Sequence, residues 1–346
     1  MKKNNKKTVV CLLFFCTLCG FWAADCFTED RLYSEWEKRI LAQKPTAEWS
    51  SVMNGSYGNA YEEWLLDQFP GRDRWVHAKT QCEILLGKKE IDGIYLGKDG
   101  YLFSESTETA DWDRLELLMK EQFGERKVSR VHVPNAGAVL KEKMPPMLCF
   151  KAVEEDRIWR RLREHRQEDI FFRTDHHWTM LGAYYAYEAW AEEQGLVPVP
   201  LQNFRKRTLK KDFLGTHYGR LHYARQADRM DFYDSGAVCD VVYDLGESRV
   251  RGMYQEQYLS TEDAYRFFLD GNHAVVQITT GMGDGHLAVL KDSFANNFVP
   301  FLLSHYGKIT VIDPRYFRAD AVEWLSGQDV TQILILAQDA AEVSCR

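Results

Sequence analysis

The chain has 346 residues, of which 45% are hydrophobic, 27% charged and 13% aromatic, and it contains only nine prolines. This composition excludes a disordered, collagen-like or low-complexity chain, and the length suits one large domain or two smaller ones with a real hydrophobic core. The formal charge is −7, and because the first 25 residues hold four lysines and one aspartate, the remainder carries 40 basic and 50 acidic groups. An acidic body without a basic stripe argues against a nucleic-acid-binding protein, since phosphate neutralisation supplies most of that affinity.

The N-terminus has the pattern of a targeting or anchoring segment. Lysines among the first seven residues precede an uncharged, largely apolar run over residues 8–24, which Asp25 closes. Positive charge before an apolar segment stays in the cytoplasm, so the rest of the chain is predicted to be translocated to the extracellular side. Signal-peptide cleavage needs small residues at alternate positions, but Trp22 stands two residues before Ala24. We therefore predict a single membrane anchor over residues 1–26, in preference to a cleaved signal, and not a polytopic transporter or channel.

Residues 27–125 are predicted to form a helical and hairpin lead-in. The segment 61–86 has the periodicity of an amphipathic helix that is broken at Pro70-Gly71. Two short apolar strands around a Gly-Lys-Asp-Gly turn predict a β-hairpin over 94–103, and residues 112–123 predict a further helix.

From residue 126 to 346 the chain alternates between strands and helices. A strand at 128–133 is followed by a helix to residue 144, a charged helix at about 151–166, a short strand at 170–172 and a strong helix over 179–194. Further strands are predicted at 238–243, 275–279, 287–290, 309–312 and 333–336, with a helix near 294–306. Short, almost continuously apolar strands between helices are typical of a mainly parallel sheet covered on both faces. The predicted fold class is α/β, as a three-layer domain over 126–346.

The segment Thr174-Asp175-His176-His177-Trp178 is the most informative in the chain. It lies between a predicted strand and the start of a helix, where functional side chains are displayed. A helix cap would account for a threonine or an aspartate here, but not for two histidines and a tryptophan. In an extended or turning segment Asp175 and His177 project to the same side, so the carboxylate can orient the imidazole as in a Ser-His-Asp triad. Spacing alone does not decide between the two histidines.

A metal site is the competing interpretation of the same cluster. His176 and His177 would then be ligands in a metal-dependent hydrolase, joined by His217, His222 or His286. These additional histidines lack a recognised ligand spacing, which weakens that interpretation.

The second candidate element is the Asp292-Ser293 pair, which follows a buried apolar strand and opens a helix. A serine there displays its hydroxyl at the carboxyl edge of the sheet, with its own N–H near the positive end of the helix dipole, which suits an attacking oxygen and one oxyanion donor. A plain helix N-cap is the alternative for either residue. Combined with Asp175 and His177, Ser293 completes a candidate triad, and Asp292 is a weaker catalytic candidate.

Other stretches accompany the Asp-His-His-Trp sequence at 175–178. They are Phe-Pro-Gly-Arg-Asp at 69–73, Tyr-Leu-Gly-Lys-Asp-Gly-Tyr-Leu within 94–103, Val-Pro-Asn at 133–135 and Lys-Asp-Ser-Phe at 291–294. With these motifs, in this order, the chain resembles the DHHW protein family, which is related to the SGNH-hydrolase-like alginate O-acetylation proteins. The resemblance covers most of residues 60–340. It implies an SGNH-hydrolase-like fold for 126–346, with Asp175 as orienting carboxylate, His177 as general base and Ser293 as nucleophile.

The chain departs from standard SGNH enzymes in two ways. Those enzymes place Gly-Asp-Ser early and Asp-x-x-His late, whereas here Asp-x-His comes first and the serine last, which is the order of the alginate-type branch. Lys291 stands where the ordinary motif has glycine, which puts close backbone approach at the oxyanion site in question.

Three loops offer weaker candidates. The amide of Asn135 could donate to an oxyanion, with an ordinary Pro-Asn turn as the alternative. Residues 215–218 are predicted to be a solvated loop, with the lining of a substrate groove as the alternative. The Gly-Met-Gly-Asp-Gly sequence at 281–285 lacks the following helix and acidic partner of a dinucleotide site and predicts a flexible hairpin turn.

Together these features predict an extracytoplasmic O-acetyltransferase, with acetylesterase activity, that acts on a cell-surface or secreted polysaccharide through Ser293, His177 and Asp175. The mechanism requires no metal or organic cofactor. The expected partners are a glycan and an acetyl donor, delivered through a membrane acetyl-export protein that only the family resemblance implies. Two alternatives stay open: a catalytically silent carbohydrate-binding or scaffold protein of the cell envelope, favoured by Lys291, and the metal-dependent hydrolase.

Overall fold

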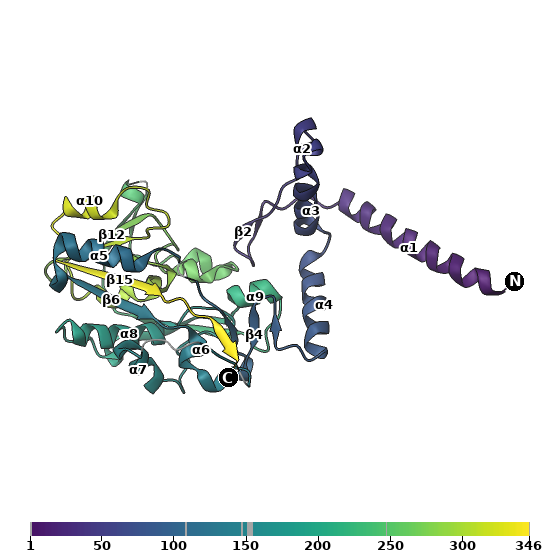
Figure 1. The fold of residues 1–346 in the computed structure, drawn as a ribbon. Helices are drawn as coiled ribbons and strands as arrows, with labels where there is room; N and C mark the ends of the chain where they lie inside the picture. The colour runs from purple at the N-terminus through teal and green to yellow at the C-terminus, as the bar shows by residue number, and fades with distance from the viewer. Residues whose placement is uncertain (1, 108, 147, 151–154, 247, 346) are drawn as a thin grey trace. The chain divides into compact units, whose positions relative to one another are not determined.

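The computed structural model describes residues 2–107, 109–146, 148–150, 155–246 and 248–345 (Figure 1). The chain divides into two compact units, one made of Met1–Gly87 with Gly219–Tyr223 and the other of Lys88–Tyr218 with Ala224–Arg346. All the residues of the candidate triad belong to the second unit.

Helices make up most of the first unit. They are α1 (Lys2–Cys26), α2 (Trp49–Met53), α3 (Ser56–Gln68) and α4 (Arg72–Leu85), with the short strands β1 (Tyr33–Ser34) and β2 (Arg39–Ile40) between the first two. The predicted break at Pro70-Gly71 separates α3 from α4, and Gly71 makes it with a left-handed backbone at φ 70°.

In the described part of the chain, one helix is long and apolar enough to cross a membrane. It is Lys7–Cys26 within α1, with a mean hydropathy of 2.0, and its residues are not buried by the rest of the protein. A helix of this kind next to the N-terminus fits a membrane anchor or a signal segment, as the sequence predicts.

A seven-stranded sheet forms the centre of the second unit, in the order β11-β10-β12-β14-β13-β15-β6. Its strands are β6 (Val128–Val133), β10 (Asp240–Tyr243), β11 (Ser248–Arg251), β12 (Val275–Thr279), β13 (His286–Lys291), β14 (Lys308–Ile312) and β15 (Gln332–Gln338). The α/β fold class is confirmed, and the sheet is mixed. Strands β14, β13, β15 and β6 run parallel, whereas β12, β10 and β11 join antiparallel. Too few residues separate β10 from β11 for the crossover that a parallel pair needs.

Both faces of this sheet are covered by helices. Leu287 and Val289 of β13 pack in the hydrophobic cluster of α7 and α8, while Ala288 and Leu290 pack in that of α5 and α10. These helices are α5 (Trp112–Phe123), α7 (Arg157–Glu164), α8 (Met180–Glu193) and α10 (Ala321–Ser326). Figure 1 shows α7 and α8 on one side of the sheet and α5 and α10 on the other, so the three-layer prediction is confirmed.

Some predicted elements differ in the structure. The helix expected up to residue 144 is the single turn α6 (Ala136–Val139), and the charged helix is α7, with residues 151–154 lying outside the described residues. The strand at 170–172 is one isolated bridge, between Phe171 and Trp178. The helix near 294–306 is a pair of 3₁₀ helices, η8 (Ser293–Asn297) and η9 (Val299–Leu302), and Pro300 in the second removes a backbone donor that an α-helix would use.

One loop contradicts its sequence prediction, and one two-stranded ribbon was not predicted. Residues 281–285 lead from β12 to β13, but β14 lies between these strands, so the hairpin prediction is wrong. Gly283 has φ 67°, and a Cβ there would come within 2.6 Å of the His305 carbonyl oxygen, so this loop packs closely. The ribbon of β8 (Arg205–Phe213) and β9 (Asp228–Asp234) was not predicted, because exposed polar and charged residues fill most of β8 and hide its alternation.

The buried His286 makes the stability of the second unit depend on pH. Burial lowers its pKa to about 4, and Lys308 contributes in the same direction. Between about pH 6.5 and 4, His286 is therefore protonated in the unfolded chain but neutral in the folded one. Stability is lost as the pH falls through this window. We expect wild type to lose on the order of 1 kcal/mol more than His286→Gln between pH 7 and 4.5, measured by urea denaturation. Equal losses in the two proteins would contradict this assignment.

Candidate functional site

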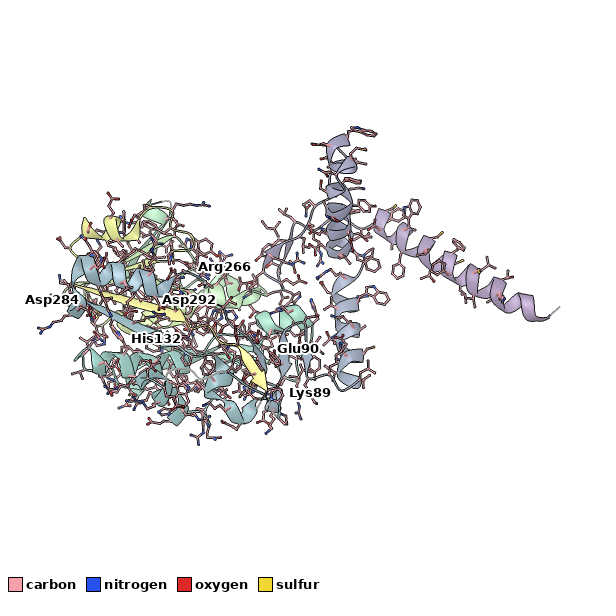
Figure 2. The ribbon with its side chains drawn as sticks, viewed as in Figure 1. Lys89, Glu90, His132, Arg266, Asp284 and Asp292 are labelled. Atoms are coloured by element: carbon pink, nitrogen blue, oxygen red, sulfur yellow. The ribbon has the colours of Figure 1, made fainter. Side chains whose placement is uncertain are left out.

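The candidate site lies where parallel strands of the central sheet end. Asp292 and Ser293 directly follow β13, and Asn135 comes two residues after β6. The Asp292 carboxylate, labelled in Figure 2, accepts a hydrogen bond from the Gln338 N–H at the end of β15, at 2.8 Å. Because parallel strands share one carboxyl edge, these residues gather there.

Asp175, His177 and Ser293 form one chain of hydrogen bonds. His177 Nδ1 lies 2.6 Å from Asp175 Oδ1, and His177 Nε2 lies 2.7 Å from Ser293 Oγ. Because a carboxylate only accepts, Nδ1 carries the proton and Nε2 is left to accept from the serine hydroxyl. Asp175 and His177 are buried, whereas Ser293 is half-buried. This arrangement can deprotonate the serine hydroxyl as it attacks.

His177, and not His176, stands between the carboxylate and the serine. Asp175 Oδ1 also accepts the peptide N–H of His177 at 2.9 Å, so one oxygen fixes both the ring and the backbone of this residue. His176 Nδ1 lies 3.6 Å from the same oxygen and 2.7 Å from Thr216 Oγ1, and its side chain is one-third exposed. The geometry therefore supports the choice that the family resemblance implied.

The second oxygen of Asp175 is held by Thr216, the first residue of the short helix α9 (Thr216–Leu221). Asp175 Oδ2 accepts the Thr216 N–H at 2.7 Å and its hydroxyl at 3.1 Å. A Cβ on Gly215 would lie 2.2 Å from Asp175 Cβ, so only glycine allows this approach. The prediction of a solvated loop is wrong, because Gly215 and His217 are buried.

Asp228 supports the segment that carries Asp175. Its Oδ2 accepts the Thr174 N–H at 2.8 Å and the Thr174 hydroxyl at 2.7 Å, and that hydroxyl oxygen accepts the Gly215 N–H at 3.1 Å. Burial raises the pKa of Asp228, opposed by these hydrogen bonds. Sequence reasoning missed Asp228 because it lies on the unpredicted strand β9, outside any motif.

Trp178 ties the histidine segment to the turn that carries the serine. Its indole is fully buried and donates to Asn297 Oδ1 at 2.7 Å and to the Phe294 carbonyl at 3.0 Å. Asn297 returns a bond from Nδ2 to the Trp178 carbonyl at 3.2 Å. The Phe294 ring also lies 4.8 Å from the His177 ring, so packing sets the separation of the two segments.

Asp292 and Asn135, the weaker candidates, both cap short helical turns. Asp292 Oδ1 accepts the Phe294 N–H at 2.9 Å, and burial raises the pKa of this carboxyl. Asn135 Oδ1 accepts the Gly137 N–H at 3.0 Å, while its amide donates to the Ser104 carbonyl at 2.9 Å. These contacts account for both residues structurally, and a catalytic part for either stays a prediction.

Lys291, which stands in place of a glycine, has a fully buried side chain. Its Nζ lies 3.4 Å from Asp313 Oδ2, and Arg315 bonds the same carboxylate through both of its oxygens. Burial lowers the pKa of Lys291 to about 8, and Asp313 opposes that shift. The fold therefore accommodates the lysine through internal charge partners.

The metal interpretation competes with the hydrogen bonds of the triad. The ligand atoms of Asp175, His176 and His177 lie within 4.8 Å of one another. Both oxygens of the first and both ring nitrogens of the last are already engaged by protein groups. Of the additional histidines, His222 belongs to the first unit and His286 lies at the opposite end of β13 from Ser293. A metal bound here would break the bonds described above.

Part of the chain is similar to a known protein family. Residues 148–312 match the DHHW protein family. The match includes the Asp-His-His-Trp motif and Ser293, and it confirms the resemblance predicted from the sequence. Among curated proteins, none matches this sequence significantly.

Several solved structures are also similar to this chain. A DHHW family protein from Eubacterium siraeum DSM 15702 is 24% identical, with a TM-score of 0.60 over 72% of this chain and 91% of that one. Bacillus cereus PatB1, solved with a sulfonyl adduct, is 17% identical, with a TM-score of 0.53 over 71% of this chain and 94% of that one. The O-acetyltransferase domain of Pseudomonas putida AlgJ is 16% identical with a TM-score of 0.39, over 71% and 90%. The first two confirm the SGNH-hydrolase-like fold.

The close approach of residue 215 to Asp175 predicts that Gly215→Ala destabilises the second unit. The added methyl overlaps the carboxylate, and neither residue has room to move without breaking a bond, so we expect a loss of about 1–3 kcal/mol. The measurement is urea denaturation of the full chain. Gly327→Ala is the matched control in the same unit, because the nearest atom to its Cβ is 3.7 Å away, and it should stay within about 0.5 kcal/mol of wild type. Similar values for the two variants would argue against a tight contact at Gly215.

Proposed function

We propose that this chain is a serine-dependent O-acetyltransferase, with acetylesterase activity, that acts on a cell-surface or secreted polysaccharide. The observation that carries the proposal is the hydrogen-bonded chain from Asp175 through His177 to Ser293. The DHHW family match and the SGNH-hydrolase-like fold support it.

In the first step, Ser293 Oγ attacks the carbonyl carbon of an acetyl donor while His177 Nε2 takes the hydroxyl proton. Asp175 stabilises the imidazolium that forms, through the bond at Nδ1. The tetrahedral intermediate then breaks its bond to the donor oxygen or sulfur, and His177 returns the proton to that leaving group. The product is an acetyl ester on Ser293.

The tetrahedral oxyanion requires hydrogen-bond donors placed around it. We propose the backbone N–H of Ser293 as one donor, because it begins the turn η8. The Asn135 amide is a second candidate, which would exchange its bond to the Ser104 carbonyl for one to the oxyanion.

In the second step, a sugar hydroxyl attacks the acetyl-serine, and His177 takes its proton. The ester bond to Ser293 breaks, the serine regains a proton, and the acetyl group leaves on the glycan. Water in place of the sugar gives hydrolysis, which is the esterase activity. An N-terminal anchor would hold the catalytic unit at the outer face of the cell membrane, and a membrane acetyl-export protein would supply the donor.

Covalent labelling of the full chain tests the nucleophile. On exposure to an activated acetyl ester, wild type should gain one acetyl group by intact-mass analysis, and Ser293→Ala should gain none. His177→Ala and Asp175→Asn should label about 10²- to 10⁴-fold more slowly, because the base is lost or misoriented. A sulfonyl fluoride, a serine reagent, gives an independent probe. Unlabelled wild type that leaves the ester unconsumed would favour the silent carbohydrate-binding or scaffold protein, for which glycan binding is then the direct assay.

Chelation separates the triad from the metal-dependent alternative. Incubation with EDTA followed by labelling should leave the rate unchanged, since every proposed step uses protein side chains alone. The metal hydrolase predicts the reverse result, in which activity is lost on chelation and restored by added Zn²⁺. Ser293→Ala treated in parallel shows how much ester is consumed without the serine.

A further inference from the structure

Tyr265, in η7 (Ala264–Phe267), touches both halves of the serine–histidine pair. Its ring stacks on the His177 imidazole, with centroids 4.1 Å apart and planes 15° from parallel. Its hydroxyl donates to the Ser293 carbonyl oxygen at 3.3 Å. The side chain is buried, and burial holds the pKa of Tyr265 well above its usual value, so the hydroxyl stays a neutral donor.

We infer that Tyr265 is a positioning residue that fixes the plane of the His177 ring relative to Ser293. The inference rests on the proposed function, because it gives Tyr265 a part in that reaction. The bonds to Asp175 at Nδ1 and to Ser293 at Nε2 hold the two nitrogens of the imidazole, but rotation about the line between these nitrogens would still tilt the plane of the ring. A stacked aromatic face restrains that tilt, and it keeps Nε2 aimed at the serine oxygen.

The rigid attachment of Tyr265 to two partners makes this restraint effective. A tyrosine is planar from its ring to its oxygen, so the face on His177 and the hydroxyl on the Ser293 carbonyl move together. Phe294 contacts the same imidazole at 4.8 Å, with its plane inclined by 53°. Two aromatic rings at different inclinations therefore contact the base, one from each of two segments.

The chain just after Tyr265 is held in an unusual conformation. Leu269, Asp270 and Gly271 are successively left-handed, with φ of 55°, 57° and 86°. Residues with a Cβ avoid this region, so such a run persists only where surrounding contacts impose it. One of those contacts comes from the serine turn, where Asn296 Nδ2 donates to the Gly271 carbonyl at 3.2 Å.

The buried lysine completes the connection. Lys291 Nζ donates to Asn296 Oδ1 at 2.9 Å and to Asn272 Oδ1 at 2.7 Å, next to its ion pair with Asp313. Asn272 directly follows the left-handed run. The network therefore joins the turn η8, which carries Ser293, to the segment of η7, which carries Tyr265. It fixes the position of the nucleophile relative to the ring that packs on the base.

The test uses three variants of the full chain. Tyr265→Leu removes the ring and the hydroxyl, and Tyr265→Phe keeps the ring. Tyr185→Leu is the matched control in α8, because the Tyr185 ring also stacks on a histidine, His165, at 3.5 Å, while its hydroxyl donates to Glu168, away from the proposed machinery. Two quantities are measured: the rate of Ser293 acetylation per folded molecule, and the downfield proton NMR resonance of His177 Nδ1–H, identified by its absence from His177→Ala.

We expect Tyr265→Leu to label at least about tenfold more slowly and to lose or broaden the resonance, because the imidazole tilts. Tyr265→Phe should stay within about threefold of wild type with the resonance kept, since the stacked face remains. Tyr185→Leu should match wild type in both quantities. Tyr265→Met repeats the comparison if the leucine variant has too small a folded fraction.

The outcomes separate this inference from the proposed function. Wild-type rate and resonance in Tyr265→Leu would overturn the positioning role and leave the triad in place. A slower rate with an unchanged resonance would also overturn it, because the imidazole would not have moved. Wild type that is not labelled at all would contradict the proposed function and the positioning role together.

Discussion

The site depends on a buried carboxylate that is bonded through both of its oxygens. Asp175 Oδ1 accepts the ring and peptide N–H groups of His177, and Oδ2 accepts the hydroxyl and peptide N–H of Thr216. Four donors replace the water that burial removes, and without them the charge would be costly to bury. Because two donors come from Thr216, which lies 41 positions further along the chain at the start of α9, the orientation of the imidazole is set by the fold as well as by the motif. Asp228 bonds Thr174, which in turn bonds Gly215, and so it supports the segments on both sides of the Asp175 carboxylate.

The distance between Ser293 and the His177 imidazole is set by contacts between the two segments that carry them. The Trp178 indole donates to Asn297 Oδ1, the Asn297 amide donates to the Trp178 backbone carbonyl, and the Phe294 ring packs beside the imidazole. Asp292 anchors the same turn to the end of β15. A hydroxyl–imidazole bond of 2.7 Å thus follows from the placement of larger, less mobile groups around it.

The sequence predicted those features whose information is local. β6 and β12 are short apolar runs with the bounds expected, and α8 begins after its capping residue Thr179. The triad residues stand out because polar side chains directly follow buried strands or precede a helix, and a family motif supports them. Gly215 and Tyr265 could not be predicted in the same way, since their partners lie 40 and 88 positions away in the chain and no spacing rule connects them. The order of the strands in the sheet could not be predicted either, because it depends on pairing between strands that lie far apart in the chain.

The position of β13 in the sheet has a consequence for when the serine–histidine pair can form. β13 is flanked by β14 and β15, and both strands come later in the chain. The Asp292 carboxylate that shapes the serine turn bonds Gln338, the last residue of β15. A growing or emerging chain therefore contains all the triad residues well before it contains the strand that fixes them. The geometry of the paired hydroxyl and imidazole therefore depends on a strand that is synthesised after every residue of the pair.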